Sequence, residues 1–181
     1  MSYPFQREMQ VAIQAVREAA VLCRAVQLQV TPVLLEKKDR SPVTIADFGS
    51  QGLVCHILAE AFADDPIIAE EDDATLRQPE NASILDQVTQ HVQAIRPTAN
   101  RSEICRWINH GNTRDYTDRF WTLDPIDGTK GFLRGEQYAI SLALILEGQI
   151  EVAALACPNL PVDPNRVEPR GAIFTAVRGR G

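Results

Sequence analysis

The sequence has few of the features that mark disulfide-rich, secreted or membrane-spanning proteins. Its cysteines lie far apart, with no Cys-x-x-Cys pair and no Cys/His metal spacing, so we expect neither a disulfide framework nor a zinc site. No apolar run approaches the roughly 18 residues of a membrane span. Charged residues interrupt the N-terminal apolar pattern, which argues against a signal peptide. We therefore expect a cytoplasmic protein with no membrane partner.

Positive charge is also scarce in this sequence. The chain has 18 Lys and Arg residues against 24 Asp and Glu residues, which gives a net charge of -6. Binding to nucleic acid depends on Lys and Arg, so we do not expect a nucleic-acid partner. If the ligand carries phosphate, positive charge must be supplied locally, and a metal ion is a suitable source.

The hydrophobic pattern predicts one α+β domain over residues 1–181, because separate helices and hairpin strands replace a regular βαβ series. Residues 36–40 and 101–118 are predicted as loops, and Ser41-Pro42 as extended backbone. The expected helices cover 5–26, 45–62 and 84–95, and the expected strands cover 30–35, 67–69, 120–123, 138–146, 150–157 and 171–177.

The most informative segment reads Trp121-Thr-Leu-Asp-Pro-Ile-Asp-Gly-Thr-Lys-Gly-Phe132. Asp124 ends a predicted strand, and Asp127 follows across a proline turn. These two carboxylates and the Ile126 carbonyl are hard oxygen ligands of the kind that Mg²⁺ prefers. An ordinary Asx turn is the alternative interpretation of such a short motif. The spacing does not fit an EF-hand calcium loop.

The residues after Asp127 indicate where an anion would bind. Gly128 has no side chain, so an anion can approach the backbone closely there. Thr129 and the following N–H groups can begin a helix whose N-terminus favours an anion. Lys130 and Arg134 can meet additional phosphate charge. Both are equally consistent with ordinary surface positions.

Two further acidic segments precede this motif. Glu70 and Glu71 follow a short predicted strand, and by themselves they are consistent with a solvated acidic run. Thr44-Ile-Ala-Asp47 has the form of a helix capping box, with Asp47 at the third helical position. A structural capping role and a catalytic role for Asp47 are compatible.

In order and spacing, these three segments resemble those of the inositol monophosphatase superfamily. The resemblance covers nearly the whole chain, from the first predicted helix to the last predicted strand. The resemblance implies the N-terminal domain of that family's layered α/β fold. It also implies Mg²⁺ ligands at Glu70, Asp124, the Ile126 carbonyl and Asp127. Asp47, Glu70 and Thr129 would orient an attacking water, so a phosphomonoester would be hydrolysed without a covalent enzyme intermediate.

The segment Lys130-Gly-Phe-Leu-Arg-Gly135, with Ser-Pro-Val-Thr-Ile-Ala-Asp-Phe-Gly-Ser-Gln51 upstream, is similar to the bisphosphate nucleotidase branch of that superfamily. The resemblance implies a small phosphorylated nucleotide, adenosine 3',5'-bisphosphate, as substrate, bound in part by Gly128, Thr129 and Lys130. An inositol phosphate or sugar phosphate is the alternative substrate. A non-catalytic, truncated relative is an alternative of a different class.

One feature of the family has no counterpart in this sequence. The family places a further metal-binding aspartate in a Trp-Asp-x-Ala-Ala motif of a second domain, whereas here Trp107 is followed by Ile and Trp121 by Thr. We therefore expect the second domain to be missing from these 181 residues.

Overall fold

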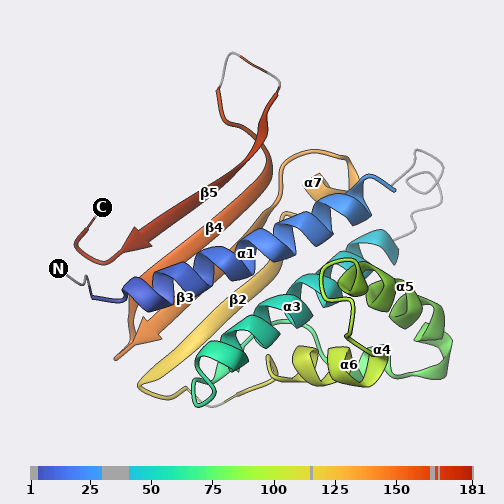
Figure 1. The fold of residues 1–181 in the computed structure, drawn as a ribbon, viewed down its shortest axis with the longest axis horizontal. Coiled ribbons are helices and arrows are strands. Elements are labelled where there is room, and N and C mark those ends of the chain that lie inside the picture. The colour runs from blue at the N-terminus through green and yellow to red at the C-terminus, as the bar shows by residue number, and fades with distance from the viewer. Residues whose placement is uncertain (1–3, 30–40, 115, 164–165, 167, 181) are drawn as a thin grey trace.

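The computed structural model describes residues 4–29, 41–114, 116–163, 166 and 168–180 (Figure 1). The strand expected over 30–35 and the loop expected over 36–40 lie outside these residues. The helices are α1 (Gln6–Gln27), α3 (Ser41–Ala61), α4 (Asp73–Leu76), α5 (Ala82–Gln93), α6 (Arg101–Asn109) and α7 (Thr129–Leu133), with a 3-10 turn, η1, at Pro79–Asn81. The strands are β1 (Ile67–Ile68), β2 (Arg119–Asp127), β3 (Ala139–Leu146), β4 (Gln149–Pro161) and β5 (Arg170–Val177).

The strands form one mixed sheet in the order β1-β2-β3-β4-β5. β1 pairs with β2 in parallel, and every other neighbouring pair is antiparallel. β2, β3, β4 and β5 are neighbours in chain order; α7 lies between β2 and β3, and a tight turn at Glu147–Gly148 joins β3 to β4 as a hairpin. The α+β class, and all of the expected strands that lie among the described residues, are confirmed.

The helices α1 and α3 pack against each other and against the sheet (Figure 1). α1 packs against β3 and β4, whereas α3 packs against β2 and also against α5 and α6. Close approach of α1 and α3 depends on Gly49, because a Cβ atom there would lie 2.8 Å from the Leu22 side chain. No helix in the described part of the chain is long and apolar enough to cross a membrane.

The beginning of α3 differs from the sequence-based expectation. The helix begins at Ser41, so Ser41-Pro42 is helical and the prediction of extended backbone there is wrong. Proline is tolerated in the first turn because its missing N–H would have no helical partner. Thr44 is therefore the fourth residue of the helix and not its N-cap, and Asp47 is not at the third position. The capping-box interpretation of Asp47 is wrong.

The loop predicted over 101–118 is also wrong in its first half, where α6 is found. Asn100 caps this helix: its Oδ1 accepts from the Glu103 N–H at 3.1 Å, and the Glu103 carboxylate accepts from the Asn100 N–H at 3.0 Å. Buried Ile104 and Ile108 follow at helical spacing and pack against the core. This reciprocal cap, followed by a short apolar stripe, is a helix-start signal that can be read from sequence.

The cap of α6 gives a stability prediction. Replacing Asn100 with Ala removes the acceptor for the Glu103 N–H and should lower the free energy of unfolding by about 1 kcal/mol, measured by urea denaturation. The control is Ser102→Ala at the neighbouring exposed position, which should stay within about 0.5 kcal/mol of wild type. Equal effects of the two substitutions would contradict the capping role.

Candidate functional site

Parallel pairing of β1 and β2 brings two acidic residues to the same edge of the sheet. Ile68 is paired with Thr122, and the same register continued by two residues aligns Glu70 with Asp124. The carboxyl ends of parallel strands meet at one edge, and neighbouring strands lie about 4.8 Å apart. After burial, repulsion from the Glu70 carboxylate is the next cause of the raised pKa of Asp124, which agrees with this proximity.

A β-bulge at Pro125–Ile126 interrupts the regular pairing near the end of β2. Asp124 is paired with Ser141 but Asp127 with Ala139, so three steps along β2 match two steps along β3. Bulges bend a strand and change the direction of its side chains. Asp127 is consequently exposed at the rim, while Asp124 stays half-buried and close enough to feel the Asp127 charge.

Asp47 lies at the floor of this cluster. It belongs to α3 and its side chain is only 9% exposed. Burial and repulsion from Glu71, Glu70 and Asp124, in that order, raise the pKa of Asp47 to about 8. Asp47 is thus close enough to feel the charges of Glu70 and Asp124, and Asp124 feels that of Asp127, so the four carboxylates that the sequence analysis selected lie in one neighbourhood.

Asp124 is the carboxylate whose surroundings fit a cation best. Its Oδ1 atom is buried and has no hydrogen-bond partner among the described residues. Burial, with repulsion from Glu70 and Asp127, raises the pKa of Asp124 to about 6, and a hydrogen bond from the Ile126 backbone N–H lowers it slightly. Between the described residues, no ion pair joins a Lys or Arg to Asp47, Glu70 or Asp124. A buried anionic oxygen without a partner is costly, and a metal ion would satisfy it.

Three or more Asp, Glu, His or Cys side chains are not already gathered around a single point in the described part of the chain. The expected ligands of the first Mg²⁺ ion are two carboxylates, Glu70 and Asp124, and the Ile126 backbone carbonyl. Their donor atoms are all oxygen atoms, which matches the preference of Mg²⁺.

The turn after Asp127 forms the short helix α7. Gly128 caps it with a φ of 93°, a left-handed conformation that disfavours other residues. Gly131 is needed for packing, because a Cβ atom there would overlap the carbonyl oxygen of Gln137. Thr129 and Lys130 are exposed at the start of α7, as is Arg134 at its end, and within the described part of the chain neither Lys130 nor Arg134 forms an ion pair with the four carboxylates. The expected helix is confirmed, while phosphate contacts by these residues remain a prediction.

Three residues at the site were given no role of their own in the sequence analysis. Glu71 repels Asp47 more than Glu70 does, and Ser50 and Gln51 on α3 are fully buried polar side chains that bond to the two acidic segments. Ser50 and Gln51 lie three and four positions after Asp47, and residues at this spacing share one face of a helix. This spacing alone could have indicated that both face the site.

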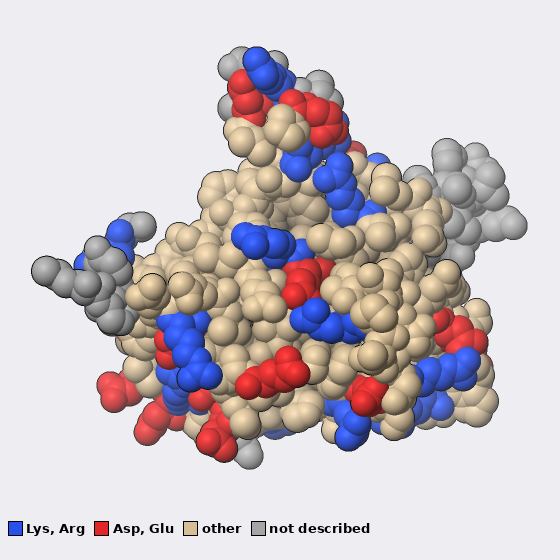
Figure 2. All heavy atoms as spheres, in the orientation of Figure 1, with Lys and Arg blue, Asp and Glu red and all other residues tan. Residues whose placement is uncertain are grey.

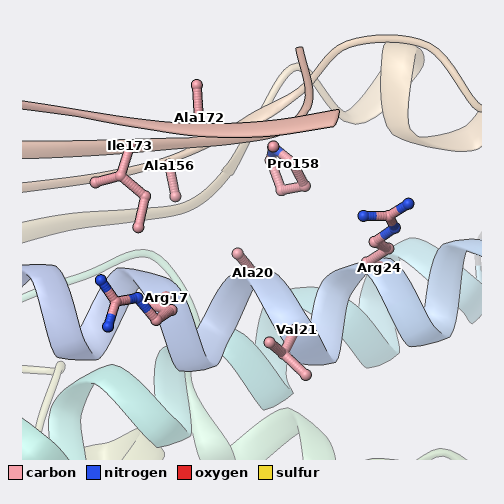
Figure 3. Close-up of a pocket in the computed structure, with 9 residues that line it drawn as sticks. Arg17, Ala20, Val21, Arg24, Ala156, Pro158, Ala172 and Ile173 are labelled. Atoms are coloured by element: carbon pink, nitrogen blue, oxygen red, sulfur yellow. The ribbon is translucent and has the colours of Figure 1, made fainter. Parts of the chain in front are cut away.

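A pocket lined by residues other than these carboxylates lies between α1 and the strands β4 and β5 (Figure 3). Its volume is about 280 Å³, and apolar residues such as Ala20, Ala156 and Ile173 form most of its wall, with Arg17 and Arg24 on the α1 side. No acidic residue lines it, so it does not belong to the candidate metal site. Over the face seen in Figure 2, acidic and basic side chains are interspersed instead of forming a broad basic field.

The mixed sheet, the helix pair on its face and the carboxylates at its edge define an α+β protein with a candidate cation site. The chain belongs to the inositol monophosphatase family, whose sequence profile matches residues 6–181. The resemblance noted from the three acidic segments is therefore confirmed.

Known relatives agree with this membership. The 3'(2'),5'-bisphosphate nucleotidase of Schizosaccharomyces pombe is 43% identical, over 98% of this chain and 55% of its own length. The 3'(2'),5'-bisphosphate nucleotidase 1 of Arabidopsis thaliana is 36% identical, over 98% and 56%. The structure of inositol monophosphatase from Anabaena shares the fold, with a TM-score of 0.55 at 18% identity, over 99% of this chain and 47% of that one. The chain thus spans about half the length of the relatives it matches.

The raised pKa of Asp47 predicts how stability depends on pH without metal. Between about pH 4 and pH 8 the folded state holds a proton on Asp47 that the unfolded state releases, so this group destabilises the fold increasingly as pH rises. Asp47→Asn removes that titration. In EDTA, its stability relative to wild type should increase with pH, by up to about 1.4 kcal/mol per unit.

Urea denaturation at pH 5, 6 and 7 measures this difference. Asp64→Asn, at an exposed carboxylate outside the cluster, is the control for removing a charge elsewhere on the chain. If the difference for Asp47→Asn does not change with pH, the pKa of Asp47 is not raised in the folded chain.

Proposed function

We propose that this chain is part of a Mg²⁺-dependent phosphomonoester hydrolase, a 3'(2'),5'-bisphosphate nucleotidase that converts adenosine 3',5'-bisphosphate to AMP and phosphate. The observation that carries the proposal is the carboxylate cluster, with the unpartnered Oδ1 atom of Asp124 inside it. Family membership and the names of the relatives at 36–43% identity support the same activity.

The residues that would hold Mg²⁺ are Glu70, Asp124 and the carbonyl of Ile126, with Asp127 beside a second ion. When bound, Mg²⁺ neutralises phosphate charge and lowers the pKa of a water molecule so that it can attack near neutral pH. These ligands come from two different segments, so the site requires the β1 and β2 ends to stay together.

The chain's own residues would position the reactants. Asp47, at the floor, and Glu70, at the rim, offer carboxylate oxygens that accept hydrogen bonds from the attacking water, and the Thr129 hydroxyl offers a third contact. Gly128 leaves the backbone open to the phosphate. Lys130 carries positive charge at the exposed start of α7, and Arg134 does so one turn later. Phosphoryl transfer depends mainly on such positioning and charge neutralisation.

We propose the substrate, the activity and the cytoplasmic location for the whole protein, because this chain covers only about half the length of its relatives. A protein of another class, a non-catalytic relative, would keep the fold and lack turnover.

Metal binding provides the first test of this function. The chain should bind Mg²⁺ weakly in a calorimetric titration, because Asp124 supplies an unpaired oxygen. Asp124→Asn should abolish the binding, since it removes a charged ligand, while Asp64→Asn should bind as wild type does. Wild-type affinity in Asp124→Asn would show that the site is misplaced.

Substrate preference separates the remaining interpretations. In a protein that extends this chain to the length of its relatives, we expect phosphate release from adenosine 3',5'-bisphosphate, in excess Mg²⁺, to have a higher kcat/KM than release from inositol 1-phosphate, because Lys130 and Arg134 suit a substrate with a second phosphate. The reverse order would favour the inositol phosphate alternative. Turnover of neither substrate by the extended protein would favour the non-catalytic relative.

A further inference from the structure

α3 carries three polar residues in a stretch that otherwise packs into the core. Asp47, Ser50 and Gln51 are separated by three and four positions, so they lie on the same face of the helix. Asp47 contributes to the carboxylate cluster, whereas the other two side chains bond to backbone groups. Ser50 and Gln51 are both 0% exposed. Buried polar groups of this kind are retained when their bonds fix a structure.

Gln51 holds the segment that follows β1. Its Nε2 atom donates to the Glu71 carbonyl at 2.7 Å, and its Oε1 atom accepts from the Glu71 N–H at 2.9 Å. Nε2 also donates to the carbonyl of Ile108 at 3.0 Å. Both backbone groups of Glu71 are therefore bound by one side chain. Gly111 leaves room for it, since a Cβ atom there would lie 2.8 Å from Nε2.

Ser50 holds the other segment. Its hydroxyl donates to the Pro125 carbonyl at 3.1 Å, within the bulge between Asp124 and Asp127. Adjacent residues of one helix thus bind the two chain segments that supply the proposed metal ligands.

Such support is needed because little strand pairing holds the two segments at a fixed separation. β1 pairs with β2 through only two residues, Ile67 and Ile68, which is a weak restraint. The bonds from Ser50 and Gln51 use backbone groups, so they leave every carboxylate oxygen free for a ligand.

We infer that Ser50 and Gln51 are positioning residues that fix the separation of the Glu70–Glu71 and Asp124–Asp127 segments, and so set the affinity of the proposed site for a divalent cation. This inference rests on the proposed function. Neither side chain touches substrate in this arrangement. Groups that orient metal ligands in this way commonly contribute about 10–100-fold to metal affinity.

Gln51→Met and Ser50→Ala test the inference in the 181-residue chain. Met keeps approximate length without the three hydrogen bonds, and Ala removes the hydroxyl that donates to the Pro125 carbonyl. The control is Thr89→Val, which removes another largely buried hydroxyl, bonded to the Leu85 carbonyl at 2.7 Å inside α5. Each variant is used at a temperature where circular dichroism shows it to be folded.

Two quantities are measured for each variant: the Kd for Mg²⁺ by calorimetry, and the exchange rate of the Glu71 amide proton by NMR without metal. For Gln51→Met we expect Kd to rise about 10–100-fold and the Glu71 amide to exchange faster. For Ser50→Ala we expect a smaller rise in Kd with Glu71 exchange unchanged. Thr89→Val should lose stability and keep the wild-type Kd, which separates positioning from general stability.

A wild-type Kd in folded Gln51→Met and Ser50→Ala would overturn the inference and leave the proposed function standing. Absence of Mg²⁺ binding by the wild-type chain would overturn the proposed function together with the inference. If Gln51→Met does not fold, Ser50→Ala decides: a raised Kd supports positioning, and an unchanged Kd contradicts it.

Discussion

Mutual repulsion among carboxylates at the end of β1 and β2 is the constraint around which the rest of the structure is arranged. Asp47, Glu70, Asp124 and Asp127 come from three segments, and burial together with repulsion from neighbouring carboxylates raises the pKa of Asp47 to about 8 and that of Asp124 to about 6. Such an arrangement costs folding free energy unless a cation offsets the charge. We therefore interpret the carboxylate cluster as a binding site that lowers the stability of the fold when no cation is bound.

The fold holds this cluster together from outside. The sheet orders the two strand ends, a bulge turns Asp127 to the rim, and α3 holds the backbone of both acidic segments through Ser50 and Gln51. α3 is itself fixed by α1, which packs closely at Gly49, and by α5 and α6 on its other sides (Figure 1). The rigid helix layer can thus oppose a repulsion that a two-residue β1 strand would resist poorly.

Local signals in the sequence predicted the parts of the site that are local in the chain. Asp124 and Asp127 were found because a proline and a glycine follow a strand. The helix α7 is as expected, but β2 continues through a bulge at Pro125–Ile126 to Asp127, so the prediction that the strand ends at Asp124 in a proline turn is wrong. Gln51 was missed because its partners, Glu71 and Ile108, are 20 and 57 positions away, and only the folded chain brings them together. The beginning of α3 was misplaced because Pro42 was taken as a break where it is part of the first turn. The start of α6 was readable from Asn100 and Glu103, but its single apolar stripe is short.

The central claim is that the carboxylates at this sheet edge bind a divalent cation. The most direct measurement is anomalous diffraction from a crystal of this chain soaked in Mn²⁺, which replaces Mg²⁺ at oxygen sites. The claim predicts an anomalous peak in contact with the Asp124 carboxylate, with the Glu70 carboxylate and the Ile126 carbonyl as its neighbours. A Mn²⁺ peak bound elsewhere on the chain, with none at Asp124, would contradict it.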